Sequence, residues 1–245
     1  MSSWLHRALR TAVVTGVLAL AISACTSKTD SPRAGTPGQN PDSPTATATP
    51  TATPSFTSSP SASSSPLTLT DRLLATAEVP GLNATWHWQD GETGPANTDP
   101  FGSCARADLT SIGATQVVQR TYFPPDDSDD FAAEQIADFP DAATTARAVA
   151  VLDSWRKRCS GLVKGTEQTY GPRKPVPIAT GTGSWYLVSF RPQGGEENRY
   201  NALGTVVNGS RIALLLISNG AQRYAYPAGQ EPMVAMVQAA ATHLE

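Results

Sequence analysis

The sequence predicts an α+β domain in which a mainly antiparallel sheet packs against helices and is held by one disulfide. Three observations lead to this prediction. Several β-rich segments follow one another through short turns, two segments have helical apolar spacing, and one pair of cysteines lies within the same part of the chain. Strands joined by tight turns pair antiparallel, and helices cover the apolar face of the sheet. We expect a single domain over residues 67–245.

The domain is expected to open with a helix and a strand. Residues 68–77 carry leucines and an alanine at helical spacing and are followed by Pro-Gly, which ends helices. Residues 84–89 (ATWHWQ) alternate, so that Trp86 and Trp88 share one face of a strand and His87 points the other way.

The next segments predict a loop, a short helix and a hairpin. A polar loop over 89–102 leads to a short helix over 108–113, which Gly113 should end. Residues 114–123 are rich in β-forming residues. A turn separates them from residues 131–139, and we expect the two segments to pair as a hairpin.

The clearest helix of the sequence spans residues 141–159. Asp141 follows a proline and can cap the helix start, while basic residues in the last turn suit its negative end. Apolar residues recur at three- and four-residue steps and should form a buried stripe. They are Val149, Leu152, Trp155 and Cys159.

The last part of the domain predicts three strands and a helix. The strands are expected over 184–191, 199–207 and 211–218, and Asn208-Gly209 is a strong signal for a tight hairpin turn between the last two. Residues 233–244 have amphipathic spacing and follow Pro232, a favourable first residue of a helix.

The first 24 residues predict a secretory signal peptide. Arg7 and Arg10 precede a short apolar run, and small residues then lead to Cys25. This pattern resembles the lipobox of bacterial lipoproteins, which implies that Cys25 carries the lipid and becomes the first residue of the mature protein. An uncleaved membrane-spanning anchor would need about 20 apolar residues, more than this run provides. The other alternative is secretion without lipid.

Residues 25–66 are expected to form the lipidated cysteine and a disordered tether. The segment consists of Ser, Thr, Pro, Ala and Gly with almost no large apolar side chains, so it cannot bury enough surface to order itself. Its composition is that of a plain linker or of an O-glycosylated stalk. Either would let the domain reach beyond the membrane surface, on the extracytoplasmic face.

Cysteine usage predicts the disulfide. With Cys25 used for lipid, Cys104 and Cys159 remain as an even pair in an oxidising compartment. A bridge between them would close a loop of about 55 residues and stabilise the fold by roughly 4 kcal/mol.

The domain resembles a family found on actinobacterial lipoproteins and on the extracellular ends of membrane Ser/Thr kinases, often named the PknH-like sensor domain. The resemblance covers the first two thirds of the domain. It rests on the opening Leu73-Leu74 and Glu78-Val79-Pro80-Gly81, then Cys104, Phe139, Asp141-Ala142-Ala143, Leu152, Trp155 and Cys159. It implies an antiparallel sheet with helices and a solvent-exposed cleft that binds a ligand, and it implies no catalytic residues. This chain has one candidate disulfide where the kinase sensor has two, and it carries no kinase domain.

A ligand-binding role is hypothesised for five side chains: Trp86, His87, Trp88, Arg191 and Arg199. The tryptophans either stack on a sugar or peptide or pack in the core, and core packing is the preferred interpretation. His87 has a structural role or contacts a ligand. A cleft lined by tyrosines and arginines near strand ends is a further hypothesis, with Tyr186, Tyr224, Tyr226, Arg191, Arg199 and Arg223 as candidates.

Several function classes find no support in the sequence. A net charge of −3 with scattered basic residues gives no footprint for nucleic acid. No G-x-S-x-G elbow, phosphate loop or dinucleotide fingerprint occurs, so neither catalytic residues nor a cofactor is predicted. The acidic turn with Asp126, Asp127, Asp129 and Asp130 lacks the EF-hand pattern, and no metal site is expected.

The sequence therefore predicts a non-catalytic lipoprotein of the cell membrane. Its lipid on Cys25 would contact the membrane, and its domain would bind a small-molecule or cell-wall ligand or act as a sensor. A structural or protein-interaction module of the envelope is the alternative. An envelope hydrolase with an unfamiliar site is a third possibility.

Overall fold

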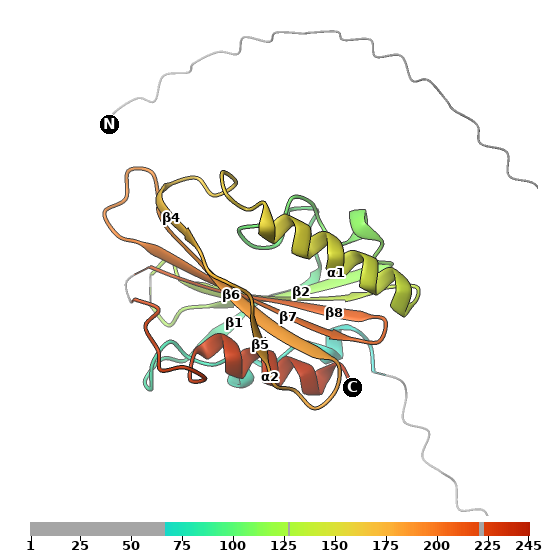
Figure 1. Cartoon of the computed structure of the whole chain (residues 1–245). Coiled ribbons are helices and arrows are strands. Elements are labelled where there is room, and N and C mark those ends of the chain that lie inside the picture. The colour runs from blue at the N-terminus through green and yellow to red at the C-terminus, as the bar shows by residue number, and fades with distance from the viewer. Residues whose placement is uncertain (1–66, 127, 221–222) are drawn as a thin grey trace, which may run out of the picture. The chain divides into compact units, whose positions relative to one another are not determined.

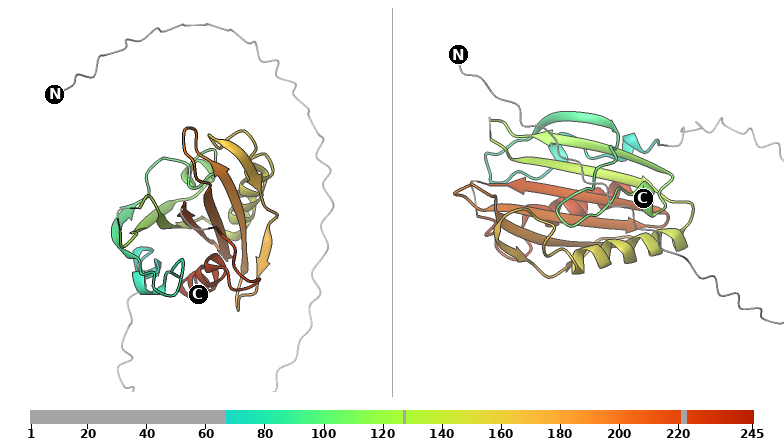
Figure 2. Two further views of the ribbon diagram at one scale, coloured as in Figure 1. Left: turned by 90° about the vertical axis from the view of Figure 1, so that its left-hand side faces the viewer. Right: turned by 90° about the horizontal axis from the view of Figure 1, so that it is seen from above.

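An antiparallel sheet of eight strands forms the centre of the domain. The computed structural model describes residues 67–126, 128–220 and 223–245, so the predicted signal peptide, Cys25 and tether lie outside the described residues. The strands are β1 Gln89–Pro95, β2 Gln116–Phe123, β3 Phe131–Asp138, β4 Thr166–Tyr170, β5 Lys174–Val176, β6 Thr182–Arg191, β7 Arg199–Asn208 and β8 Arg211–Asn219. They lie in the order β1-β2-β3-β8-β7-β6-β4, and β5 also pairs with β6. Figure 2 shows the twist of this sheet.

Two α-helices cover the sheet from opposite sides (Figure 1). They are α1, Ala142–Lys157, and α2, Pro232–His243. Three short 3₁₀ helices accompany them: η1 Thr70–Arg72, η2 Thr76–Glu78 and η3 Thr110–Ile112. The predicted fold class, an antiparallel α+β domain with one disulfide, is confirmed.

The helix ends follow the expected chemistry. The Asp141 carboxylate accepts a hydrogen bond from the backbone N–H of Thr144 at 2.6 Å and so caps α1. Gly113 ends η3 with a φ of 107°, a conformation that favours glycine. Gly209, with a φ of 57°, sits in the turn that joins β7 and β8, as the Asn-Gly pair predicts.

The face that carries α2 holds one continuous core. It combines the inner side of α2 with alternate residues of the central strands and the leucines of the opening segment. Gly204 on β7 makes this close packing possible, because a Cβ there would lie 2.6 Å from the Met233 sulfur and 2.8 Å from a Val237 methyl carbon. The first turns of the helix therefore lie close to the sheet at this strand.

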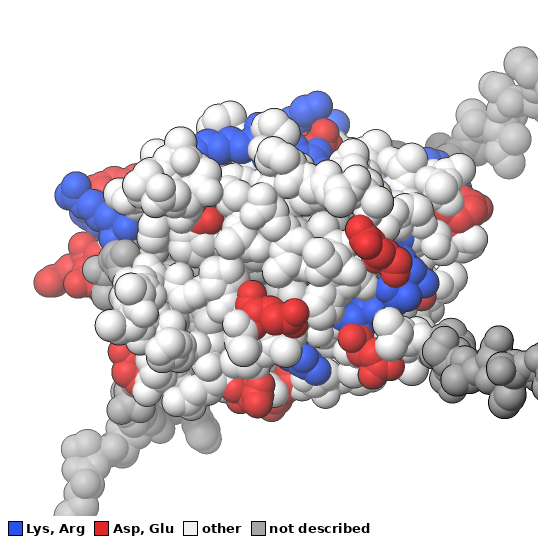
Figure 3. Space-filling view, turned by 90° about the horizontal axis from the view of Figure 1, so that it is seen from below, with Lys and Arg blue, Asp and Glu red and all other residues white. Residues whose placement is uncertain are grey.

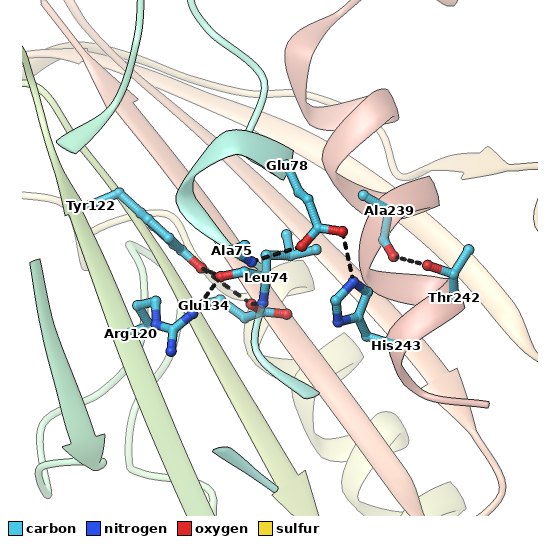
Figure 4. Close-up of polar contacts among 9 residues, drawn as sticks. All are labelled: Leu74, Ala75, Glu78, Arg120, Tyr122, Glu134, Ala239, Thr242 and His243. Carbon is cyan, nitrogen blue, oxygen red and sulfur yellow. Dashed lines mark hydrogen bonds and ion pairs between the residues drawn. The ribbon is translucent and has the colours of Figure 1, made fainter. Parts of the chain in front are cut away.

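The predicted helix over 68–77 is wrong, because long-range hydrogen bonds take the place of helical ones. The backbone N–H of Leu74 donates to the Glu134 carboxylate at 2.7 Å, and its carbonyl accepts from Arg120 and Tyr122, each at 2.8 Å (Figure 4). Only the turns η1 and η2 remain helical. Arg72 completes the attachment by donating to the carbonyl of His243 at the end of α2.

The predicted strand over 84–89 is also wrong. The side chain of Asn83 accepts hydrogen bonds from the backbone N–H and the hydroxyl of Thr85. The backbone carbonyl of Asn83 accepts a hydrogen bond from the N–H of Trp86. This closes a turn of the kind that Asn favours. The strand begins at Gln89 instead, within the stretch expected to be a polar loop, and pairs with β2 at the sheet edge.

Two short strands, β4 and β5, were not predicted from the sequence. Both pair with β6, and residues 171–173 separate them, so this edge of the sheet is interrupted. Edge strands are often short, polar and marked by Pro or Lys, which leaves little hydrophobic periodicity to detect.

The disulfide joins Cys104 to Cys159, just beyond the end of α1. Both cysteines are buried and lie in a small cluster with Val163, Val188 and Leu203, on the face of the sheet that carries α1. The bridge therefore attaches one end of this helix to the sheet by a covalent bond.

Candidate functional site

Helix α1 buries much less of its inner surface than α2. Only Thr145 and Ala148 are buried in α1, whereas six residues are buried in the shorter α2. Val149, Leu152 and Trp155, which the sequence places on a buried stripe, remain partly exposed. Apolar side chains that face a sheet yet stay accessible indicate a space between the helix and the strands.

That space is a narrow cleft between two separate apolar clusters. One cluster contains the disulfide, and the other surrounds Ala148 and the start of α1. The cleft has a cavity volume of about 40 Å³, room for about three water molecules. Its apolar walls come from α1, β7, β8 and the segment before the disulfide, and include Phe101, Val149, Leu152, Trp155, Leu203 and Leu214.

The polar lining of the cleft comes from two arginines that share one carboxylate. The Nη1 of Arg173 lies 2.6 Å from the Oδ1 of Asp153, and its Nε donates to Ser184 at 2.7 Å. The Nε of Arg156 lies 3.8 Å from the same Oδ1, too far for a hydrogen bond. This Nε is buried and has no hydrogen-bond partner among the described residues. Two cations against one anion leave this lining with an excess of positive charge.

Tyr186 adds a hydroxyl group to the same lining. The guanidinium of Arg156 lies 5.8 Å from the centre of the Tyr186 ring, within the range of a cation–π contact. Burial raises the pKa of Tyr186 to about 12, so the hydroxyl stays protonated and can donate at neutral pH. The cleft thus combines hydrogen-bond donors and positive charge with apolar walls.

This combination suits an amphiphile with an anionic head. A carboxylate or phosphate oxygen can accept from Arg156 and Tyr186, which would satisfy the buried Nε. An apolar tail can contact the accessible stripe of α1. Of the tyrosines that the sequence suggested for a cleft, Tyr186 lies here, whereas Tyr224 and Tyr226 line another one.

Sequence reasoning missed the three charged residues of this cleft. Asp153 and Arg156 are three residues apart on a helix, a spacing that marks a pair on one face. This spacing could have been recognised in the sequence. No sequence pattern marked Arg173, because the break between β4 and β5 brings it to the cleft.

The tryptophans singled out in the sequence belong to the core on the α2 face. Trp88 is buried and donates from Nε1 to the carbonyl of Pro80 at 2.9 Å. Trp86 packs against it edge to face, with ring centres 5.4 Å apart. His87 is exposed. The preferred interpretation of the tryptophans as core residues agrees with this packing.

The two arginines singled out in the sequence lie at the ends of β6 and β7. Arg191 pairs with Glu167 at 2.8 Å, and Arg199 pairs with Asp130 at 3.5 Å and contacts Asp129. The structure therefore separates the five hypothesised ligand-binding residues: the two tryptophans lie in the α2-face core, His87 is exposed, and the two arginines lie at this end of the sheet.

A buried carboxyl group, Glu134, is the other unusual polar feature of the domain. It accepts from Leu74 and lies 3.4 Å from the Tyr122 hydroxyl, and its second oxygen has no partner among the described residues (Figure 4). Burial raises its pKa to about 7. The side chain is completely covered, so its described contacts indicate a role in holding the opening segment on the sheet.

The remaining surface and the described helices add three observations. On the face that carries α2, Lys and Arg form no continuous patch (Figure 3). Within residues 67–126, 128–220 and 223–245, no three His, Cys, Asp or Glu side chains are grouped to hold a metal ion. In the same ranges no helix has the length and hydropathy needed to span a membrane.

Comparisons with known proteins give a likeness in structure. No protein-family model and no curated protein matches the chain. A solved structure with similarity is the crystal structure of the extracellular domain of PknH from Mycobacterium tuberculosis. It is 15% identical with a TM-score of 0.49, and the match covers 71% of this chain and 94% of that domain. At this level the likeness carries no conclusion about function.

The buried Glu134 predicts a specific pH dependence of stability. Its pKa is about 7 in the folded state and near 4.5 when unfolded, so between these values the folded state binds the extra proton. The free energy of unfolding should therefore fall as the pH rises from 4.5 to 7, by about 3 kcal/mol from this group. Urea denaturation at a series of pH values measures it.

The substitution Glu134→Gln should remove this contribution. Over that pH range, the free energy of unfolding of the variant should lack the fall that Glu134 causes in the wild type. Glu167→Gln, which changes a half-exposed carboxylate, serves as the control and should keep the wild-type slope. An unchanged slope in Glu134→Gln would show that Glu134 does not titrate there.

Proposed function

We propose that this protein is a lipid-anchored, extracytoplasmic binding protein of the cell membrane. Its domain captures an amphiphile with an anionic head group in the cleft beneath α1, without catalysing a reaction. Residues 1–24 act as the lipoprotein signal peptide, Cys25 carries the lipid, and residues 25–66 form the tether.

Export is supported by the sequence and agrees with the disulfide. The leader and the small residues before Cys25 match a lipoprotein processing site. The bridge between Cys104 and Cys159 is typical of proteins in an oxidising compartment. A diacylated cysteine binds a membrane firmly, so the domain surface needs no basic patch to stay there.

Ligand capture is supported above all by the unpartnered Nε of Arg156. A buried charged donor without an acceptor is costly, and an acceptor supplied by a ligand would remove that cost. Asp153 is already engaged by Arg173 at 2.6 Å and lies too far from this nitrogen to satisfy it. An anion would also balance the excess positive charge of the lining.

The apolar part of the ligand is supported by the accessible stripe of α1. Val149, Leu152 and Trp155 expose surface toward the cleft. A hydrocarbon chain that covers them would gain about 25 cal/mol for each Å² of apolar surface removed from water. Because the cleft holds only about 40 Å³, α1 must move outward for the chain to enter. Because few residues of α1 are buried, this movement exposes little apolar surface and costs little free energy.

Binding without catalysis agrees with the residues that line the cleft. They include no histidine, and the cysteine among them is held in the disulfide. A hydrolase that uses a side-chain nucleophile needs a base within hydrogen-bond reach of it. Among the residues that line this cleft, the one carboxylate, Asp153, is engaged by Arg173 instead of by a hydroxyl group.

A protein-interaction role is the second candidate, and one observation favours it. Phe123 and Phe131, at the facing ends of β2 and β3, are 47% and 36% exposed. Exposed aromatic side chains are enriched at protein interfaces. Crosslinking in cells through a photoreactive residue at 123 would capture a specific protein if this hairpin is an interface.

Decanoate is a suitable first probe for the cleft. We expect decanoate to bind and to raise the melting temperature of the wild-type chain, whereas decanol and acetate, which each lack one half of the amphiphile, should bind much more weakly. Arg156→Gln should weaken decanoate binding by about tenfold or more, because a charge-assisted hydrogen bond contributes about 1.5–3 kcal/mol. Isothermal titration calorimetry measures the affinities, and thermal melting measures the rise in melting temperature.

The matched control is Arg147→Gln, which removes an exposed arginine of the same helix. It should bind decanoate like the wild type. Equal affinity of Arg156→Gln and the wild type, or no binding of decanoate and decyl phosphate by the folded protein, would contradict the proposed site. Preference for decyl phosphate would keep the site and identify the head group as a phosphate.

Lipid anchoring is tested separately at Cys25. Cys25→Ser should shift the protein from the membrane fraction to the soluble fraction of the cells that express it. Mass spectrometry of the wild type should find an N-terminal acylated cysteine and no residue before it. An unmodified cysteine behind an intact leader would contradict the anchor and leave the cleft prediction untouched.

A further inference from the structure

A second cleft lies on the opposite face of the sheet, on the side of α2. Its cavity volume is about 220 Å³. Three aromatic residues, Trp185, Tyr224 and Tyr226, line it together with Leu187, and an ion pair between Lys174 and Glu231 completes the lining. This cleft shares no lining residue with the one beneath α1.

The aromatic rings form a fixed wall. The ring centres of Trp185 and Tyr224 are 5.9 Å apart, and those of Tyr224 and Tyr226 are 4.9 Å apart in an edge-to-face arrangement. The Tyr224 hydroxyl accepts from the N–H of Met233 at 3.1 Å, and the Tyr226 hydroxyl donates to the carbonyl of Leu82 at 2.6 Å. The contacts between the rings, together with these two hydrogen bonds, hold the rings in place beside the cleft.

The ion pair places a donor and an acceptor side by side against this wall. The Nζ of Lys174 lies 3.4 Å from the Oε1 of Glu231 and 4.7 Å from the centre of the Trp185 ring. Glu231 is nearly buried and its Oε2 accepts from the N–H of Gly229 at 2.6 Å, so the carboxylate is fixed. Lys174 is half exposed and keeps ammonium protons for a ligand.

We propose that this second cleft binds a single sugar ring. Neighbouring hydroxyl groups of a sugar can accept from an ammonium and donate to a carboxylate that lie next to each other. The apolar C–H face of the ring can pack on the tyrosine rings. The ion pair is neutral as a whole, so it gives no preference for a charged ligand. A cavity of 220 Å³ is below the range of drug-sized pockets, which limits the occupant to about one ring.

The interruption of the sheet edge explains why the polar pair lies here. Residues 171–173 separate β4 from β5, and side chains alternate in direction along extended backbone. Arg173 therefore reaches Asp153 on the α1 side, while Lys174 reaches Glu231 on the α2 side. A sugar site here is independent of the proposed amphiphile site.

Saturation-transfer NMR on the full chain with N-acetylglucosamine and glucose as probes tests the proposal. At least one of them should receive saturation from the protein. Lys174→Met, which keeps the aliphatic stem over Trp185 but removes the donor, should weaken its binding by at least about tenfold. Lys157→Met, an exposed lysine near the end of α1, is the matched control and should bind like the wild type.

Two further variants separate stacking from loss of fold. Tyr226→Ala should weaken binding, whereas Tyr226→Phe, which keeps the ring, should retain it; thermal melting confirms that each variant is folded. The proposal is overturned if the folded wild type binds neither monosaccharide, or if Lys174→Met binds as tightly as the wild type. It is also overturned if tetramethylammonium binds in place of the sugars, because that would identify a cation site. Decanoate binding, which uses the other cleft, should be unchanged in every variant.

Discussion

The disulfide between Cys104 and Cys159 is the constraint on which the arrangement of the α1 face depends. It fastens the residue just beyond the end of α1 to a small cluster on the sheet, while the first half of the helix is held by its buried residues, Thr145 and Ala148. A helix held at these two places need not be packed along its length. The apolar stripe in between stays partly exposed, and the cleft follows from it.

The opposite face of the sheet is built in the other way. There α2 packs closely against β6 and β7, because Gly183 and Gly204 carry no side chain where the helix comes nearest. The opening segment closes the same core through Leu74 and the buried Glu134. The stability of the domain therefore resides mainly on the α2 face. The α1 face is free to open, which is the usual division between a rigid scaffold and a binding element.

Local signals in the sequence predicted the elements that depend on local chemistry. The Asn208-Gly209 turn, the Asp141 cap, the Gly113 stop and the cysteine pair are each specified by a few neighbouring residues. The errors fall where distant residues decide. Glu134 draws the backbone of Leu74 out of a helix, and the polar edge strands β1, β4 and β5 are held by main-chain bonds to their neighbours. The charged lining of the first cleft needs Arg173 from such an edge, so only Asp153 and Arg156 were within reach of sequence reasoning.

Native-state hydrogen exchange of the backbone amides tests most directly whether α1 is held only in its first half and at its disulfide-bonded end. The amides of residues 149–156, between Ala148 and the disulfide-bonded end of α1, should exchange through local openings whose free energies lie well below that of global unfolding. The amides of α2 should exchange only when the whole domain unfolds. Equal protection of the two helices would contradict the account, because α1 would then be packed along its length and the cleft could not widen to admit a ligand.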